Sequence, residues 1–350
     1  MELPSCAKYD GTQGVRPEDS RSGSAGIALR PARHLLTAGV NVSRTVYAGR
    51  AWGVLLRTVG GHKQVEAAKA RRAVDAAIST VSSLGLTVDD AVVLSDSYRL
   101  VVHLTPCDVI ARVTLLTHFA SAELEVELAR RLMQTDSPVA ALEARVGPRV
   151  FVRDGFKITM WTYVEPVQSR VLPPADYAQA LERLHAGLRQ LDFTTPHVMD
   201  RIAVTQRDVA SRDVTPELAD ADRALLADTL RDLGRSIANR RAPEQLLHGE
   251  PHPGNVLDTK NGPLFIDFEN TAEGPVEYDI AWVPQEVAER YPNADEDLVG
   301  DCRGVVLAII ATHRWSRGDQ HPSGGRKSGL AFLNALRDGP PWPALDEFTW

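Results

Sequence analysis

Apolar residues recur with two different periods in the region that follows residue 64. Residues 65–84 carry them at helical spacing, and Gly85 is where that helix should end. Three apolar runs, which we interpret as antiparallel strands, follow at residues 91–94, 98–104 and 109–115. Helical spacing returns at 121–132, where three leucines form one stripe. The pattern therefore predicts a small antiparallel sheet with helices before and after its strands.

The second half of the pattern is mainly helical. Short strands at 150–152 and 157–164 flank Asp154 and Gly155, a strong turn signal, and prolines from residue 166 onward mark a crossing into a second region. Leucine-rich helical patterns then occupy residues 177–191, 216–239, about 295–316 and 325–337. This order predicts an α+β protein with two lobes, at 65–165 and 166–350.

Composition narrows the class of protein without identifying it. The chain has 350 residues, 43% of them hydrophobic and 24% charged, which is ordinary for a globular protein. Its formal net charge of −7 argues against a nucleic-acid partner. Three scattered cysteines do not indicate a disulfide framework or a zinc site, and no apolar run reaches membrane-spanning length. We expect a cytoplasmic protein with no membrane partner, either a monomer or a dimer.

Residues 1–64 differ from the rest of the chain. They are rich in Gly, Ser and Arg, carry more basic than acidic residues and show no sustained period. Such a composition cannot bury much apolar surface, so we expect a disordered extension. A basic segment could also contact an acidic partner, although a passive extension is the simpler interpretation.

Three polar positions stand out between residues 246 and 282. Glu250 follows an apolar pair, Asn255 comes five residues later, and Asp267 lies in the run LFIDF at 264–268, which we interpret as a buried strand. A carboxylate in such a strand is costly to bury without a partner for its charge, and a bound cation is the simplest partner. Mg²⁺ favours a few hard oxygen ligands together with phosphate, which Asn255 and Asp267 could provide.

These residues lie in three consecutive motifs: HGEPHPGNVL from residue 248, FIDFE from 265 and GPVEYDIA from 274. The series resembles the aminoglycoside phosphotransferase family of kinase-like small-molecule kinases. The family pattern is approximately H-G-D-x-H-x-x-N-x-L, then an apolar residue with I-D-F/W-E/D, then G-x-x-x-x-D-L-A. This chain departs from it at Glu250, where the family usually has aspartate. The resemblance implies a bilobal protein-kinase-like fold with ATP and Mg²⁺ between the lobes.

The resemblance also implies roles for individual residues. Glu250 would accept the proton of the acceptor hydroxyl, and Asn255 and Asp267 would hold Mg²⁺. Asp279, which an N-cap role alone could explain, would support the catalytic loop, as would His248. His252 either lines the site or is simply packed within the loop.

Nucleotide contacts are implied in the first lobe. Arg112 stands where the family strand carries a phosphate-contacting lysine, and Glu125, or less suitably Glu123, would pair with it. Ser95 and Ser97 lie in the position of the loop that covers the nucleotide, although this loop has no glycine and could be an ordinary turn. Backbone groups of Thr162 and Val164 would contact adenine, or the segment is a plain inner strand.

The sequence therefore predicts transfer of the γ-phosphoryl group of ATP to a hydroxyl of a small molecule, either an aminoglycoside-like antibiotic or a hydroxylated metabolite. Catalysis would rest mainly on positioning and charge neutralisation. The alternative is a catalytically impaired nucleotide-binding pseudokinase that acts as a regulator. Glu250, Arg112 and the glycine-free loop favour that alternative, whereas both metal-ligand candidates favour the enzyme.

Overall fold

The computed structural model describes residues 63–96, 99–116, 121–167, 172–317, 319 and 325–348. The predicted extension therefore lies outside the described residues, apart from its last two positions, which belong to a helix. Among the residues described, every helix is too short or too polar to span a bilayer.

The first part of this structure is built on a five-stranded antiparallel sheet. Its strands are arranged in the spatial order β1-β2-β3-β5-β4. Their bounds are Val88–Asp96 for β1, Leu100–Pro106 for β2, Val109–Leu115 for β3, Phe151–Arg153 for β4 and Phe156–Thr162 for β5. β3 lies at the centre, so its side chains are covered on both faces.

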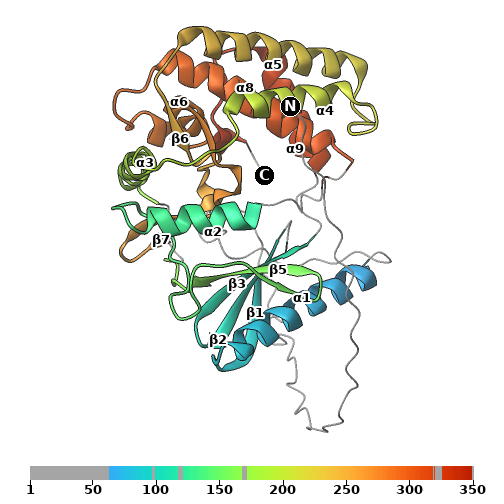
Figure 1. Ribbon diagram of the computed structural model, residues 1–350. Helices are drawn as coiled ribbons and strands as arrows, with labels where there is room; N and C mark the ends of the chain where they lie inside the picture. Colours follow the sequence, from blue (N-terminus) through green and yellow to red (C-terminus); the bar gives the residue numbers. More distant parts are fainter. Residues whose placement is uncertain are drawn as a thin grey trace, which may run out of the picture. The chain divides into compact units, whose positions relative to one another are not determined.

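The two faces of the sheet meet different helices (Figure 1). α1, Lys63–Ser83, covers one face, and its alanines pack against the side chains that β3 points toward it, Val109, Ala111 and Val113. The intervening residues of β3 face the other way, toward α2, Ser121–Leu132. Strand alternation thus places Arg112 on the α2 face, where it meets Glu125.

The second part is mainly helical. Its helices are α3 Pro174–Leu188, α4 Val198–Ala210, α5 Asp220–Arg240, α6 Val276–Ile280, α7 Gln285–Ala288, α8 Glu296–Trp315 and α9 Gly325–Asp338. This part also contains two short antiparallel strand pairs. β6, Glu244–Leu247, pairs with β9, Ala272–Pro275. Between them in the chain, β7, Val256–Thr259, pairs with β8, Gly262–Phe265. Short 3₁₀ turns follow at η1 Pro253–Asn255, η2 Phe268–Asn270 and η3 Leu345–Glu347.

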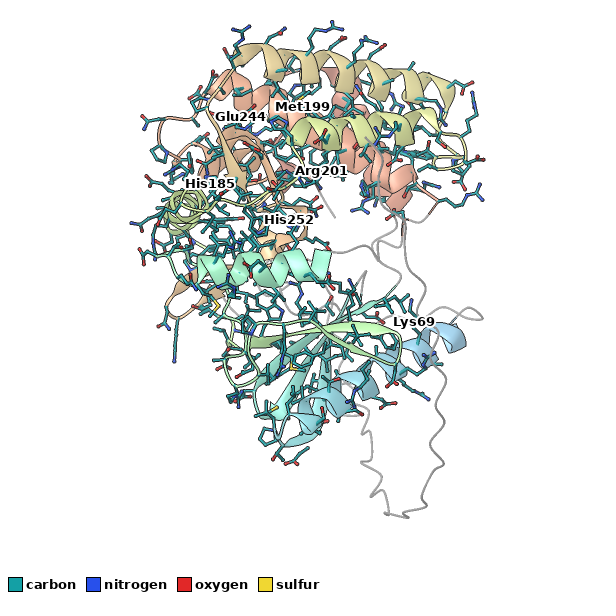
Figure 2. The ribbon with its side chains drawn as sticks, viewed as in Figure 1. Lys69, His185, Met199, Arg201, Glu244 and His252 are labelled. Atoms are coloured by element: carbon teal, nitrogen blue, oxygen red, sulfur yellow. The ribbon has the colours of Figure 1, made fainter. Side chains whose placement is uncertain are left out.

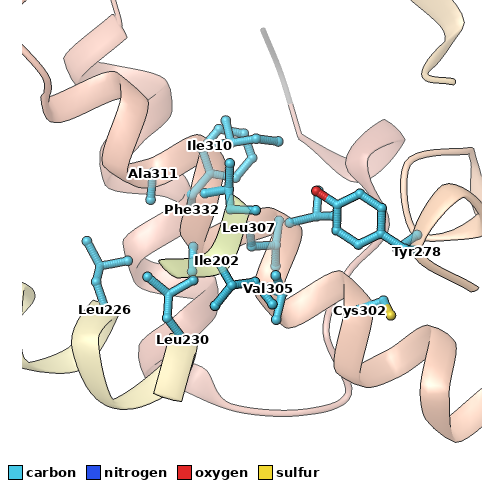
Figure 3. Close-up of a cluster of buried hydrophobic side chains, with 14 of the residues drawn as sticks. Ile202, Leu226, Leu230, Tyr278, Cys302, Val305, Leu307, Ile310, Ala311 and Phe332 are labelled. Carbon is cyan, nitrogen blue, oxygen red and sulfur yellow. The ribbon is translucent and has the colours of Figure 1, made fainter. Parts of the chain in front are cut away.

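α8 forms the centre of the helical core. Residues 304–312 are all buried, because this helix is apolar on every side rather than on one face. Figure 3 shows Val305, Leu307 and Ile310 of α8 among side chains from α4, α5 and α9. The helix therefore serves as the common surface on which the second part is assembled.

The C-terminal segment completes this core. The residues predicted to be extended, 340–343, lead into η3, where Leu345 is 6% exposed. Trp342 packs against Gly304, and a Cβ at that glycine would lie 2.8 Å from the indole nitrogen. Phe348 packs on Phe332 with ring centroids 4.5 Å apart. Residues 342–348 are therefore part of the fold.

The structure confirms the predicted order of elements and corrects several bounds. α2 and β3 have the predicted limits, whereas α1 begins at Lys63, two residues earlier than expected. β2 begins and ends two residues later than expected, α3 lies three residues earlier, and α5 begins at Asp220 rather than residue 216. α4 was not predicted, although Val198, Ile202, Thr205 and Val209 give its buried face helical spacing.

One correction concerns the site directly. Asp267 does not lie in a strand, because β8 ends at Phe265. The Ile266 amide donates to the carbonyl of Asn255, 3.0 Å away, in the register of the β7–β8 pair, so the pairing goes one residue beyond the strand. Asp267 then adopts the left-handed conformation, with φ of 71°, and precedes η2. The chain turns at this carboxylate, which is how the side chain leaves the apolar run.

Candidate active site

The loop that carries Glu250 is anchored by a buried carboxylate on α6. Asp279 is fully buried and accepts the backbone amides of His248 and Gly249, both at 2.8 Å. Asp279 also contacts the Nε2 atom of His185 on α3, at 2.9 Å. Asp279 does not cap its own helix, where Pro275 is the N-cap residue. The predicted support of the loop by Asp279 is confirmed.

His248 holds the same loop through both of its ring nitrogens. It is fully buried, its Nε2 lies 3.0 Å from the Ile266 carbonyl, and its Nδ1 lies 3.3 Å from the Glu250 amide. Burial lowers the pKa of His248 below its ordinary value, which favours the neutral imidazole that these two contacts require. The histidine is therefore structural, as the sequence predicts.

Glu250 meets a residue that sequence patterns did not reveal. Arg201 on α4 forms an ion pair with Oε1 of Glu250, and its other terminal nitrogen donates to the Gly249 carbonyl at 3.2 Å. The Arg201 guanidinium also lies 5.8 Å from the centre of the Trp282 ring. Burial opposes the charge of Arg201, but Tyr278 and Glu250 outweigh it and raise its pKa. One arginine thus holds both the backbone and the side chain of the loop.

The indole of Trp282 connects this pair to the rest of the loop. The ring of His252 lies 6.1 Å from it, tilted by 41°, and the Nδ1 of His252 accepts the Gly254 amide at 3.0 Å. Figure 2 shows where Arg201 and His252 start, on α4 and on the loop respectively. Burial lowers the pKa of His252, although the residue remains partly exposed. The interpretation of His252 as a packed loop residue is the one these contacts support.

Asn255 links the segments that carry Glu250 and Asp267. Its side-chain nitrogen donates to the Glu250 carbonyl at 2.9 Å, so its side-chain oxygen is the atom free to act as a ligand. Its backbone carbonyl accepts the Ile266 amide at 3.0 Å, one residue before Asp267. Hydrogen bonds of Asn255 therefore join the turn that carries Glu250 to the turn that carries Asp267.

Asp267 lies against two arginines. Arg112 approaches Oδ2 at 2.9 Å, and Arg99 approaches Oδ1 at 3.4 Å. Burial disfavours the charged form of Asp267, but Arg112 and Arg99 outweigh it and lower the carboxyl pKa to about 2. Asp267 is therefore ionised throughout the physiological pH range.

Both arginines also bind Glu125 of α2. Arg112 pairs with Oε1, as predicted, and Arg99 pairs with Oε2 at 2.8 Å. Glu123, the second choice for this role, instead pairs with Lys157 at 2.8 Å. Arg99 reaches a third carboxylate, Glu269 of η2. We call these five residues the charge cluster: Arg99, Arg112, Glu125, Asp267 and Glu269.

The two carboxylate oxygens of Asp267 differ in their contacts. Oδ1 is buried, makes no hydrogen bond and lies 3.4 Å from Arg99, whereas Oδ2 is bound by Arg112. The described residues contain no group of three or more His, Cys, Asp or Glu side chains suited to a metal. A metal here would thus take Asp267 and Asn255 as protein ligands and complete its shell with phosphate and water, the arrangement that Mg²⁺ prefers.

The remaining predicted nucleotide contacts are only partly described. Ser95 lies at the end of β1, partly exposed, beside a bulge between Val93 and Ser95. Ser97 lies outside the described residues. The Thr162 amide donates to the Ala141 carbonyl at 2.9 Å, so it is not available to adenine. Val164 lies two residues beyond the end of β5 and is partly exposed. Contact of these residues with a nucleotide stays a prediction.

Sequence reasoning missed Arg99, Arg201, Glu269 and His185. Glu269 was visible as the last residue of FIDFE, and Arg99 follows the predicted nucleotide loop. Arg201 had no signal of its own, because the helix that carries it was not predicted. Each of these side chains acts through partners that are distant in sequence.

Comparison with known proteins shows the family of this chain. The family model described as "Phosphotransferase enzyme family" matches residues 93–301, well over half of the chain. No curated protein sequence matches significantly.

Solved structures share the fold. An amicoumacin kinase in complex with AMP-PNP, Ca²⁺ and its ligand is 14% identical, with a TM-score of 0.59 over 81% of this chain and 98% of that one. The GDP complex of a mutant aminoglycoside 2′-phosphotransferase is 14% identical, with a TM-score of 0.55 over 75% and 96%. A microcompartment-associated aminopropanol kinase is 18% identical, with a TM-score of 0.55 over 74% and 94%. The chain belongs to the phosphotransferase enzyme family and has the kinase-like fold of enzymes that phosphorylate hydroxyl groups of small molecules.

Proposed function

We propose that this chain transfers the γ-phosphoryl group of ATP to a hydroxyl of a small molecule, with Mg²⁺ bound by Asn255 and Asp267. The observation that carries the proposal is the bonding of Asn255 to both neighbours. Its side chain binds the Glu250 carbonyl at 2.9 Å, and its own carbonyl binds the amide before Asp267 at 3.0 Å. A base and two metal ligands are thereby held in one rigid unit, as phosphoryl transfer requires.

Glu250 is the residue that we assign to the acceptor hydroxyl. Arg201 occupies its Oε1 atom, so Oε2 is the oxygen that would accept the hydroxyl proton. The pairing with Arg201 and the two amides bound by Asp279 fix where that oxygen lies. The extra methylene of glutamate is accommodated by a guanidinium that holds the carboxylate at the end of the longer side chain.

Arg112 is the residue that we assign to the phosphates. It is 8% exposed and already bound to Glu125 and Asp267, so its guanidinium is fixed before the nucleotide arrives. The bound metal would neutralise charge that develops on the transferred phosphoryl group. Asp267 stays ionised to hold it, because Arg112 and Arg99 outweigh the effect of burial and keep its pKa at about 2.

The acceptor is a small hydroxylated molecule, either an antibiotic or a metabolite. One structural relative is an amicoumacin kinase and another is an aminopropanol kinase. Antibiotics and metabolites should therefore both be tested as acceptors. The assay would follow ADP release from Mg·ATP with a panel of aminoglycosides, other hydroxylated antibiotics, amino alcohols and sugars. GTP would be run in parallel as donor.

Three variants make this assay decisive. Glu250→Gln and Asp267→Asn should abolish transfer, whereas Glu217→Gln, a control at a side chain that is 67% exposed, should not. Absence of transfer to every acceptor, together with nucleotide binding by the wild type, would instead support the regulatory pseudokinase.

A further inference from the structure

Arg99 is held in a position that the kinase-like site does not require. Its side chain is only 9% exposed, and it contacts Glu125, Asp267 and Glu269, which come from α2, the segment after β8 and η2. A buried guanidinium among three carboxylates is strongly charged, because Glu125, Asp267 and Glu269 outweigh burial and raise its pKa. The residue itself begins the approach to β2, directly after the predicted nucleotide loop.

Arg99 duplicates Arg112 in its choice of partners. Both arginines pair with Glu125 and both pair with Asp267, through different carboxylate oxygens in each case. Arg99 pairs in addition with Glu269, and Asp267 lies between the two guanidinium groups. The second arginine therefore adds positive charge to the place where the phosphates of the nucleotide are expected.

The contact between Arg99 and Asp267 is the weakest in the cluster. The nearest atoms are 3.4 Å apart and Oδ1 makes no hydrogen bond, whereas Arg112 approaches Oδ2 at 2.9 Å. A metal ion at Oδ1 would repel the Arg99 guanidinium, and a phosphate beside it would attract it. Arg99 can therefore leave Asp267 for a ligand more easily than Arg112 can.

The protein environment also explains why a cation is needed here. The segment from Ser95 to Arg99 contains no glycine, so its backbone is less able to wrap closely around phosphate than a glycine-rich loop. The charge cluster sets three carboxylates against two arginines, so a phosphate that enters needs a cation that can turn toward it. Arginine can replace loop amides as a bidentate phosphate donor.

We propose that Arg99 is a second phosphate-binding residue, which exchanges Asp267 for a phosphate of the nucleotide and gives this chain affinity for nucleoside diphosphates even without a metal ion. The inference rests on the proposed function, because it assumes that the nucleotide occupies the site at Asp267. It adds a ligand contact that none of the motifs assigns.

The test is calorimetric binding of ADP and of adenosine, each in EDTA and in millimolar Mg²⁺, with GDP and guanosine in parallel. The wild type should bind ADP in EDTA. Arg99→Gln should weaken that binding at least tenfold, about 1.4 kcal/mol, and should change adenosine binding less than about twofold. Arg183→Gln, which removes an exposed arginine from its pair with Asp136, is the matched control and should change neither.

A second variant covers the case in which Arg99→Gln does not fold. Glu269→Gln removes one competing carboxylate and should strengthen ADP binding in EDTA several-fold. The proposal is overturned if the wild type binds ADP only with Mg²⁺, if Arg99→Gln lowers ADP and adenosine binding equally, or if Glu269→Gln leaves ADP binding unchanged. A wild type that binds ADP in EDTA but transfers no phosphoryl group would overturn the proposed function alone.

Discussion

At the scale of single residues, the site is organised by arginines that hold carboxylates. Arg201 holds Glu250, and Arg112 holds Asp267. In each of these pairs, one carboxylate oxygen is bound closely by the arginine. The other oxygen of Asp267 makes no hydrogen bond but lies 3.4 Å from Arg99. The departure from the family motif at Glu250 is thus matched by a partner that meets the longer side chain.

Substitutions at Glu250 test this match. Glu250→Gln should remove transfer and retain nucleotide binding, because an amide cannot take the hydroxyl proton. Glu250→Asp should lower the rate by roughly tenfold or more, since the shorter side chain cannot reach both Arg201 and the acceptor. Single-turnover transfer, or slow ATP hydrolysis if no acceptor is known, measures both. An increase of tenfold or more in Glu250→Asp would show that the native site is impaired rather than adapted.

Asp267 should confer the metal dependence of nucleotide binding. In the wild type, Mg²⁺ together with ADP should raise the melting temperature more than ADP in EDTA does. Asp267→Asn should abolish that difference, because Asn255 alone is a poor metal site. Asp220→Asn, at an exposed side chain, is the control, and an unchanged Mg²⁺ effect in Asp267→Asn would refute the metal assignment.

At the scale of elements, the catalytic loop is fixed at both ends of its backbone. Asp279 holds the amides of His248 and Gly249, and Asn255 holds the Glu250 carbonyl. Gly249 has φ of 90°, and a Cβ there would lie 1.8 Å from the Asn270 carbonyl oxygen. The loop is therefore packed directly on the turn that follows Asp267.

A pair of glycine substitutions separates close packing from backbone strain. Gly85 has a similar φ of 82° but open space around it, so Gly85→Ala should cost only about 1 kcal/mol of unfolding free energy. Gly249→Ala should cost clearly more, about 3 kcal/mol or above, and should abolish transfer, because it forces the loop away from η2. Denaturant unfolding measures both changes. Equal costs would mean that the contact with Asn270 is not tight.

The elements show where sequence patterns are sufficient and where they are not. α2 and β3 could be predicted to the residue because their apolar periods are uninterrupted, and Glu250, Asn255 and Asp267 could be predicted from motif spacing. The end of β8 could not, since the run LFIDF continues an apolar pattern through a residue with left-handed backbone. Arg99 and Arg201 could not be predicted either. Their significance depends on partners 26 to 170 residues away, which no local pattern encodes.

At the scale of the whole molecule, the core formed by the described residues begins with α1. The side chains of α1 that cover the sheet begin at Ala73, and the described sheet takes all five of its strands from residues 88–162. A chain shortened by its first 60 residues keeps every contact described above. We therefore expect unchanged cooperativity of unfolding and nucleotide affinity within about twofold. Differential scanning calorimetry and titration with ADP would show otherwise if the shortened chain melted earlier or aggregated.

The packing of Trp342 and Leu345 also bears on how the protein is made. Because synthesis is vectorial, α8 leaves the ribosome before the segment 342–348 that covers part of it. This part of the core can therefore close only after residue 348 has emerged, while the sheet with α1 and α2 can form earlier. Affinity tags are better placed at the N-terminus, since a C-terminal fusion adjoins residues that must still dock, and premature termination would release a chain prone to aggregation.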